Sequence, residues 1–119
     1  MNVLRFAGVA IVVAACASTR IPPTGDPMVA MSTAERAITD AQAAGADTLA
    51  SGILTEARTA LESAKGAAIK DRNRAALLAR RAAADAAYAQ AVAERTIAER
   101  SRSAAQAELQ RVPPPGGAR

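Results

Sequence analysis

The sequence has almost none of the residues from which enzyme sites and deep hydrophobic cores are usually built. It contains no histidine and no tryptophan, and only one cysteine, one tyrosine and one phenylalanine. The lack of histidine beside a single cysteine excludes histidine acid–base chemistry, Cys/His metal sites and an intramolecular disulfide. We therefore expect no catalytic residues, no metal and no cofactor.

Alanine supplies most of the hydrophobic content, with 34 of the 119 residues. Each alanine buries little surface, and burial contributes only about 25 cal/mol per Å² of apolar area. A deep globular core is therefore excluded, whereas closely packed helices remain compatible with the composition. We expect at most one small domain.

The first sixteen residues have the layout of an export signal. Arg5 and the amino terminus precede an uncharged apolar run over residues 6–15. This run is too short to cross a membrane, which takes about 20 helical residues, but it suits a signal peptide. An aliphatic residue and two small residues then lead into the only thiol: Val13, Ala14, Ala15, Cys16. This motif resembles the bacterial lipobox, in which the residues before the cysteine are read by the lipoprotein signal peptidase.

The lipobox resemblance implies a signal peptide over residues 1–15 and a lipidated Cys16. The thiol would carry a diacylglycerol and the freed amine an N-acyl chain, so the protein would be anchored to a membrane. The alternatives are an ordinary buried cysteine and an uncleaved anchor helix. Ala17 stands where the enterobacterial inner-membrane retention signal has Asp. We therefore expect the periplasmic face of an outer membrane, with the inner membrane as the alternative.

Behind the cysteine, residues 16–26 contain Pro22, Pro23 and Gly25 and predict a flexible tether. Asp26-Pro27 is then a typical helix start, with Asp as the N-cap. The first helix has an apolar stripe at helical spacing and ends at Gly45: Met31, Ala34, Ile38, Ala41. After a link over residues 46–51, a second stripe ends within residues 66–70: Leu54, Ala57, Leu61, Ala64, Ala68.

Asp71 can cap a third helix that meets no Gly or Pro before Pro113. Its expected stripe mixes three- and four-residue steps: Ala75, Leu78, Ala82, Ala86, Ala89, Ala93, Ile97. At ~1.5 Å per residue this helix spans roughly 60 Å, so part of it should project as a single arm. The predicted fold is all-α: an antiparallel hairpin of two short helices plus a long third helix, with coiled-coil-like packing. The helical domain covers residues 27–111, and residues 112–119 form a disordered Pro/Gly tail.

One pattern in the second helix resembles a known family. Its spacing is Leu-x-x-Ala-Arg-x-x-Leu-x-x-Ala-Lys: Leu54, Ala57, Arg58, Leu61, Ala64, Lys65. With the lipobox, the tether and the long Ala/Arg helix, this is similar to the bacterial lipoproteins of the domain-of-unknown-function family DUF4398, over residues 33–109. Ser51-Gly52 stand where family members often have a proline. The resemblance implies a helical architecture and an envelope location, but no activity.

Charge is distributed unevenly along the chain. Residues 17–64 carry 3 basic and 6 acidic side chains, whereas residues 65–119 carry 11 basic and 5 acidic. Six of the basic residues cluster around the predicted turn between the second and third helices: Lys65, Lys70, Arg72, Arg74, Arg80, Arg81. Export and the lack of aromatic residues argue against nucleic acid. We hypothesise that this turn lies on the membrane side and contacts anionic lipid; the alternative is a solvated basic turn.

These features predict a membrane-anchored scaffold or spacer module of the cell envelope, without catalysis. The exposed half of the long helix would bind another copy or another envelope protein, and binding would be lost when Ala86, Ala93 or Ile97 is changed to Glu. The alternative is a structural lipoprotein bound non-covalently to peptidoglycan, because the chain ends in Arg119 rather than the lysine used for covalent wall linkage. A third hypothesis is an enzyme or small-ligand carrier, for which the sequence has few pocket-forming side chains.

Overall fold

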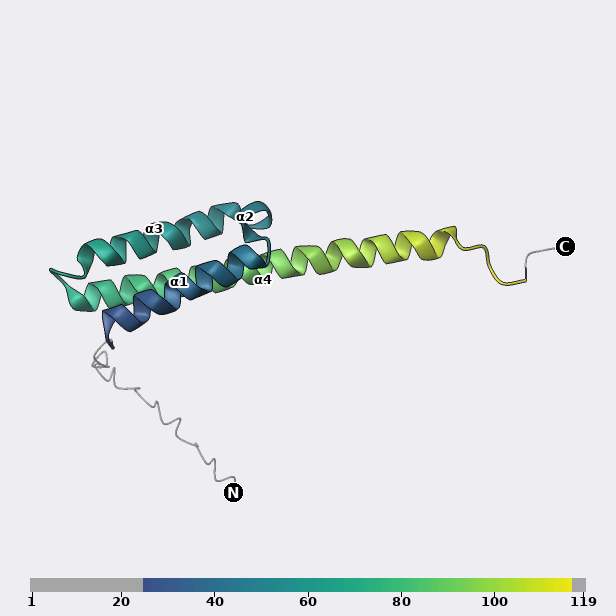
Figure 1. Cartoon of the computed structure of the whole chain (residues 1–119). Coiled ribbons are helices and arrows are strands. Elements are labelled where there is room, and N and C mark those ends of the chain that lie inside the picture. Colours follow the sequence, from purple (N-terminus) through teal and green to yellow (C-terminus); the bar gives the residue numbers. More distant parts are fainter. Residues whose placement is uncertain (1–24, 117–119) are drawn as a thin grey trace, which may run out of the picture.

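The computed structural model describes residues 25–116, and all regular secondary structure in this range is helical (Figure 1). The helices are α1 (Pro27–Ala43), α2 (Ala46–Leu49), α3 (Ser51–Ala67) and α4 (Arg72–Arg111). The expected all-α fold with a long last helix is confirmed. The predicted signal peptide, Cys16, the tether up to residue 24 and residues 117–119 lie outside the described residues.

The predicted helix boundaries rest on local hydrogen bonds. The Asp26 carboxylate accepts a hydrogen bond from the Met28 N–H at 2.9 Å, with proline in the first turn of α1. Gly45 follows the end of α1 with a φ of +87°, a left-handed conformation that side chains other than glycine rarely adopt. The Asp71 carboxylate likewise accepts from the Arg74 N–H at 2.9 Å and caps α4.

The segment between α1 and α3, predicted as a simple link, contains the additional helical turn α2. The Gly45 carbonyl accepts hydrogen bonds from the N–H groups of Thr48 at 3.2 Å and Leu49 at 3.1 Å, and also from the Thr48 hydroxyl at 3.1 Å. Ala46 is fully buried. The turn therefore both reverses the chain and closes one end of the core.

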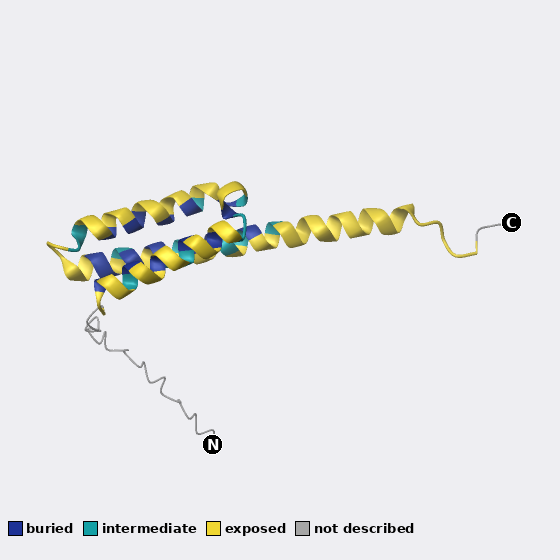
Figure 2. Ribbon diagram, in the orientation of Figure 1, coloured by how far each residue is buried: buried dark blue, intermediate teal, exposed yellow. Residues whose placement is uncertain are grey.

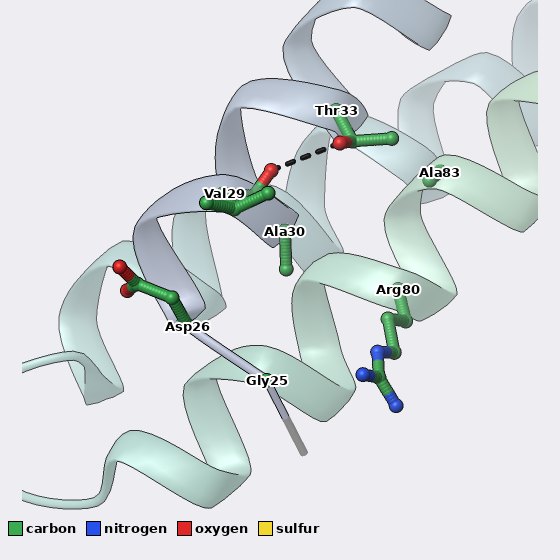
Figure 3. Close-up of a pocket in the computed structure, with 7 residues that line it drawn as sticks. All are labelled: Gly25, Asp26, Val29, Ala30, Thr33, Arg80 and Ala83. Atoms are coloured by element: carbon green, nitrogen blue, oxygen red, sulfur yellow. Dashed lines mark hydrogen bonds between the residues drawn. The ribbon is translucent and has the colours of Figure 1, made fainter.

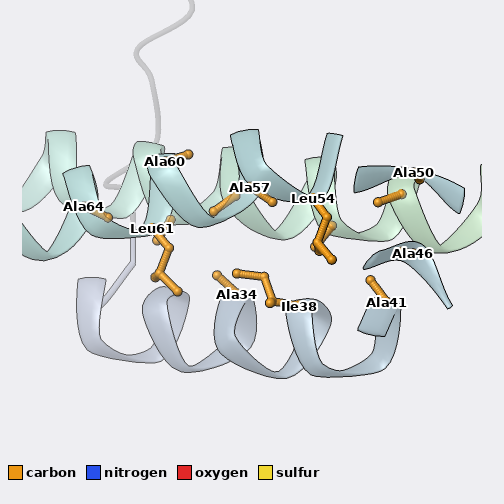
Figure 4. Packing of buried hydrophobic residues seen from close by; sticks show 14 of the residues in the cluster. Ala34, Ile38, Ala41, Ala46, Ala50, Leu54, Ala57, Ala60, Leu61 and Ala64 are labelled. Atoms are coloured by element: carbon orange, nitrogen blue, oxygen red, sulfur yellow. The ribbon is translucent and has the colours of Figure 1, made fainter. Parts of the chain in front are cut away.

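Helix α4 is the centre of the packing. Helices α1 and α3 each pack along α4 far more extensively than along each other, so the two short helices form a cradle for α4 (Figures 1 and 4). The side of α4 that faces them is built of fully buried alanines: Ala75, Ala76, Ala79, Ala82, Ala86, Ala89, Ala93. Because a methyl group is small, two helices can approach α4 closely at once.

The larger apolar side chains come from the two short helices. Ile38 of α1 and Leu61 of α3 lie between these helices, and Leu54 is the largest fully buried side chain (Figure 4). The expected buried stripes of α1 and α3 are confirmed as far as Ala64, and Ala68 is half-buried. The stripe expected on α4 is wrong at two positions. Leu78 is only half-buried and Ile97 is 48% exposed, because the buried seam passes through Ala79 and stops at Ala93.

Helix α4 has two halves with different surroundings. We call residues 72–93, which pack against α1 and α3, the covered half. We call residues 94–111 the arm, because none of them is buried and the helix continues there without a neighbour among the described residues (Figure 2). The expected projecting arm is confirmed, and its helix is roughly 27 Å long at ~1.5 Å per residue. Residues 112–116 follow as exposed, non-helical chain.

Candidate functional site

The start of α1 and the α3–α4 turn lie at the same end of the molecule, opposite the arm (Figure 1). Arg72 Nη2 lies 3.7 Å from Asp26 Oδ1. Arg80 extends from α4 beside Gly25 and Asp26, and together they line a shallow groove between α1 and α4 (Figure 3). We call this end, from which the chain leads back toward Cys16, the proximal end.

Lys65 of the predicted basic cluster is neutralised by two carboxylates. Its Nζ lies 3.1 Å from Glu62 Oε1 on the same helix and 3.2 Å from Glu35 Oε1 on α1. Hydrogen bonds to Glu62 and then to Glu35 raise the pKa of Lys65 above its ordinary value of 10.5. Lys65 therefore ties α1 to α3 instead of offering a free positive charge.

The other five cations of the predicted cluster divide into paired and unpaired side chains. Arg72 faces Asp26, and Arg81 Nε lies 3.5 Å from Asp85 Oδ2 in the next turn of α4. Lys70, Arg74 and Arg80 form no ion pair within residues 25–116. Of the six side chains, Lys65, Arg72 and Arg81 therefore have a carboxylate within 4 Å, and the other three do not within residues 25–116.

Arg80 and Arg81 lie on different sides of α4. Arg80 lines the groove with Gly25 and Val29 of the α1 side. Arg81 instead lines a depression with Thr55 and Thr59 of α3. Lys70 and Arg74 line a third depression, around the α3–α4 turn itself. The unpaired cations thus flank the proximal end from two sides.

Sequence reasoning missed a group of exposed apolar side chains at the proximal end. Ile69, in the α3–α4 turn, is 94% exposed, and Met28 and Val29 in the first turn of α1 are each 64% exposed. Ile69 lies off the helical stripe and next to Lys70, so its position in the sequence could have indicated that it points to solvent. Met28 lies in a depression with Ala68 next to that turn and Val29 lies in the groove with Arg80, and both placements depend on the tertiary packing.

The arm carries its own stabilising pairs and two exposed large apolar side chains, Ile97 and Leu109. Arg95 Nε donates to Glu99 Oε1 at 2.8 Å, and this hydrogen bond raises the pKa of the guanidinium above its ordinary value. Arg111 Nη1 lies 3.6 Å from Glu108 Oε2. Leu109 is 73% exposed. Salt bridges between neighbouring turns support an unaccompanied helix.

Two residues assigned to a partner surface are buried. Ala86 and Ala93 are fully covered by the helices of the same chain, so they contribute to the core and offer nothing to a second protein. Of the three residues expected to report on a partner, only Ile97 is exposed. The exposed side chains that could serve instead are Leu109 and the alanines of the arm.

The profile of the family described as a domain of unknown function, DUF4398, matches residues 29–111. The match runs from the first turn of α1 to the last residue of α4. The chain belongs to the DUF4398 family. No curated protein and no solved structure matches this DUF4398 chain.

The described part of this DUF4398 protein shows no metal-binding cluster, because no three Asp or Glu side chains of residues 25–116 come together in a suitable group. Among the helices α1 to α4, none combines the length and the apolar character needed to cross a membrane.

Proposed function

We propose that this DUF4398 protein is a membrane-anchored lipoprotein of the bacterial envelope. It would be attached through Cys16 to the periplasmic face of the outer membrane, and its helical domain would act as a spacer and docking module without catalysis. The observation that carries this proposal is that the two ends of the molecule differ in structure. The described chain begins with Gly25 and α1 at one end, and the arm extends from the other end (Figure 1).

The two ends suit different tasks. The proximal end would stay near the membrane, because residues 17–24 connect it to the acylated cysteine. The arm would extend from the opposite end, where an uncovered helix can pair with a helix of another copy or of another envelope protein. The covered half and the arm are one continuous helix, so the arm would keep a fixed direction relative to the proximal end.

The attachment is tested by labelling cells with an alkyne-bearing fatty acid. We expect the wild-type protein to take up the label and to sediment with outer-membrane fractions. The Cys16→Ser variant should lose the label, and after a high-salt wash, which screens any electrostatic binding, it should no longer sediment with outer-membrane fractions. Absence of label on the wild-type protein would contradict the anchoring.

The docking role is tested by crosslinking in intact cells followed by purification of the tagged protein. We expect a crosslinked partner that is lost in Leu109→Glu and Ala105→Glu, because both side chains are exposed on the arm. Ala43→Glu, at an exposed alanine of α1, is the matched control and should retain the partner. Equal crosslinking in all variants would rule out docking through the arm.

Two further measurements separate the kinds of partner. Sedimentation equilibrium of the Cys16→Ser form reports pairing between copies of this chain. Sedimentation with purified peptidoglycan reports the alternative structural role as a cell-wall-associated lipoprotein. A chain that remains monomeric and does not sediment with peptidoglycan, yet crosslinks in cells, must bind a different protein.

A further inference from the structure

The proximal end combines two features that are unfavourable for a surface facing only water. Its turn exposes Ile69 almost completely. In the first turn of α1, the exposed Met28 lines a depression with Ala68, and the exposed Val29 lines the groove with Arg80. Each of these side chains could have been polar without any cost to the core, because none of them contributes to the buried seam. Apolar residues gathered at one tip of a molecule typically mark an interaction surface.

Three of the cations around this tip form no ion pair within residues 25–116, whereas Arg72 faces Asp26 at 3.7 Å. Lys70 is adjacent to Ile69, and Arg74 follows one turn into α4. Arg80 lies on the α1 side, next to Gly25. By contrast, Lys65 faces Glu62 and Glu35 at 3.1 and 3.2 Å, and Arg81 faces Asp85 of its own helix at 3.5 Å. Lys70, Arg74 and Arg80 therefore leave positive charge without an ion pair at the proximal end of the described chain.

We propose that the proximal end is a second membrane contact, specific for anionic lipid. Ile69, Met28 and Val29 enter the boundary between headgroups and acyl chains, and Lys70, Arg74 and Arg80 meet lipid phosphates. A basic rim around an apolar tip matches the chemistry of that interface, where apolar burial and electrostatic attraction add up. Each cation near such a surface contributes roughly a fivefold gain in partitioning.

The inference deepens the proposed function and rests on it. An acyl anchor followed by a tether fixes position but leaves the orientation of the helical domain free. A second contact at the α3–α4 turn restricts that orientation, since α4 starts at the contact and the arm ends at the far side. The proximal end would thus direct the arm away from the membrane.

The test uses the mature chain with Cys16→Ser, which removes the acyl anchor and leaves only the proposed contact. Binding is measured by co-sedimentation with vesicles of phosphatidylcholine alone or mixed with phosphatidylglycerol, at low and at high salt. We expect binding to the mixed vesicles only, and weaker binding at high salt because exposed charges are screened. The Lys70→Glu/Arg74→Glu variant should bind at least roughly tenfold more weakly.

The matched control is Arg100→Glu/Arg102→Glu on the arm. It changes the net charge by the same amount, at exposed side chains that form no ion pair within the described residues. We expect this control to retain most of the binding. An equal loss in both double variants would show attraction by net charge alone and overturn the proposal.

Ile69→Ser tests the apolar part. It should reduce binding to mixed vesicles by a few-fold without changing the helix content measured by circular dichroism, because Ile69 lies outside the core. Unchanged binding in this variant would overturn the apolar insertion. Failure of the vesicle experiment leaves fatty-acid labelling of Cys16 unaffected, so loss of the second contact and loss of the anchor are distinguishable.

Discussion

The two halves of α4 form one uninterrupted helix, yet they are held by different forces. In the covered half, buried alanines recur at four- and three-residue steps, the spacing of a coiled-coil seam: Ala75, Ala79, Ala82, Ala86, Ala89, Ala93. The same spacing continued into the arm falls on Thr96, Arg100 and Ser103. The alanine seam of α4 therefore stops after Ala93, at the end of the domain where α1 ends and α3 begins.

The comparison shows how a helix can extend beyond its own domain. The costly step of helix formation is nucleation, and the covered half provides a nucleus fixed by tertiary contacts. The arm only has to propagate from it, assisted by pairs such as Arg95–Glu99 and by the Gln90–Glu94 hydrogen bond at 2.8 Å. We infer that the stability of the domain resides in the covered half and that the arm depends on it.

The largest effect is expected when a charged side chain is placed at the centre of the buried seam of the covered half. Ala82→Glu places a carboxylate at a fully buried position between α4 and the short helices. We expect a loss of at least ~3 kcal/mol in the free energy of unfolding, since neither space nor a partner is present there. Urea unfolding followed at 222 nm measures it.

Ala105→Glu makes the same substitution on the arm, at an exposed position. We expect a change within roughly 0.5 kcal/mol, as for other surface substitutions. A comparable loss in both variants would mean that the arm also packs against something in solution.

Substitutions at Asp71 test whether its side chain stabilises the start of α4 and thereby the covered half. Asp71→Ala removes the acceptor of the Arg74 N–H and should cost about 1 kcal/mol of unfolding free energy. Asp71→Asn retains an oxygen acceptor and should recover most of this loss. If the two variants unfold at the same urea concentration, the cap hydrogen bond contributes nothing.

The sequence predicted the helix boundaries well because their signals are local. Asp26 and Asp71 cap helices with their own side chains, and Gly45 ends α1 through its positive φ. The seams of α1 and α3 were also predictable, since Ile38, Leu54 and Leu61 stand out among smaller residues. On α4 the choice between Leu78 and Ala79 failed, because alanine occurs on every side of that helix.

The candidate site was less predictable, because it depends on which charges meet across the fold. Glu35 and Lys65 are thirty positions apart and on different helices, so their ion pair follows only from the packing of α1 against α3. The separation of Arg80 from Arg81, although they are adjacent in sequence, follows from the position of α4 between the two short helices. A count of basic residues cannot distinguish these arrangements.

Glycine substitutions compare the two halves of α4 at equal exposure. Ala84 in the covered half and Ala105 in the arm are both solvent-exposed helical alanines. Ala84→Gly should lower the free energy of global unfolding by about 1 kcal/mol, the helix propensity difference between the two residues. Ala105→Gly should leave global unfolding unchanged and accelerate amide hydrogen exchange only in the arm, because the arm opens separately. Identical losses of global stability would contradict separate opening.

The smallest expected effect concerns the ion pairs that join α1 to α3 beside the covered half. Because the pKa of Lys65 is raised in the folded protein, its contribution to stability is fully present at neutral pH. It is lost as the pH rises above 10.5 and through the raised value, when the ammonium loses its proton and its hydrogen bonds to Glu62 and Glu35 lose their charge. The Tm of Lys65→Met should therefore lie slightly below that of the wild type at neutral pH, and the two Tm values should converge in strong alkali.

Lys70→Met, at a cation without an ion pair in the described chain, should match the wild type in Tm at neutral pH. A gap between wild type and Lys65→Met that persists unchanged in alkali would show that Lys65 acts through its aliphatic stem rather than through its charge.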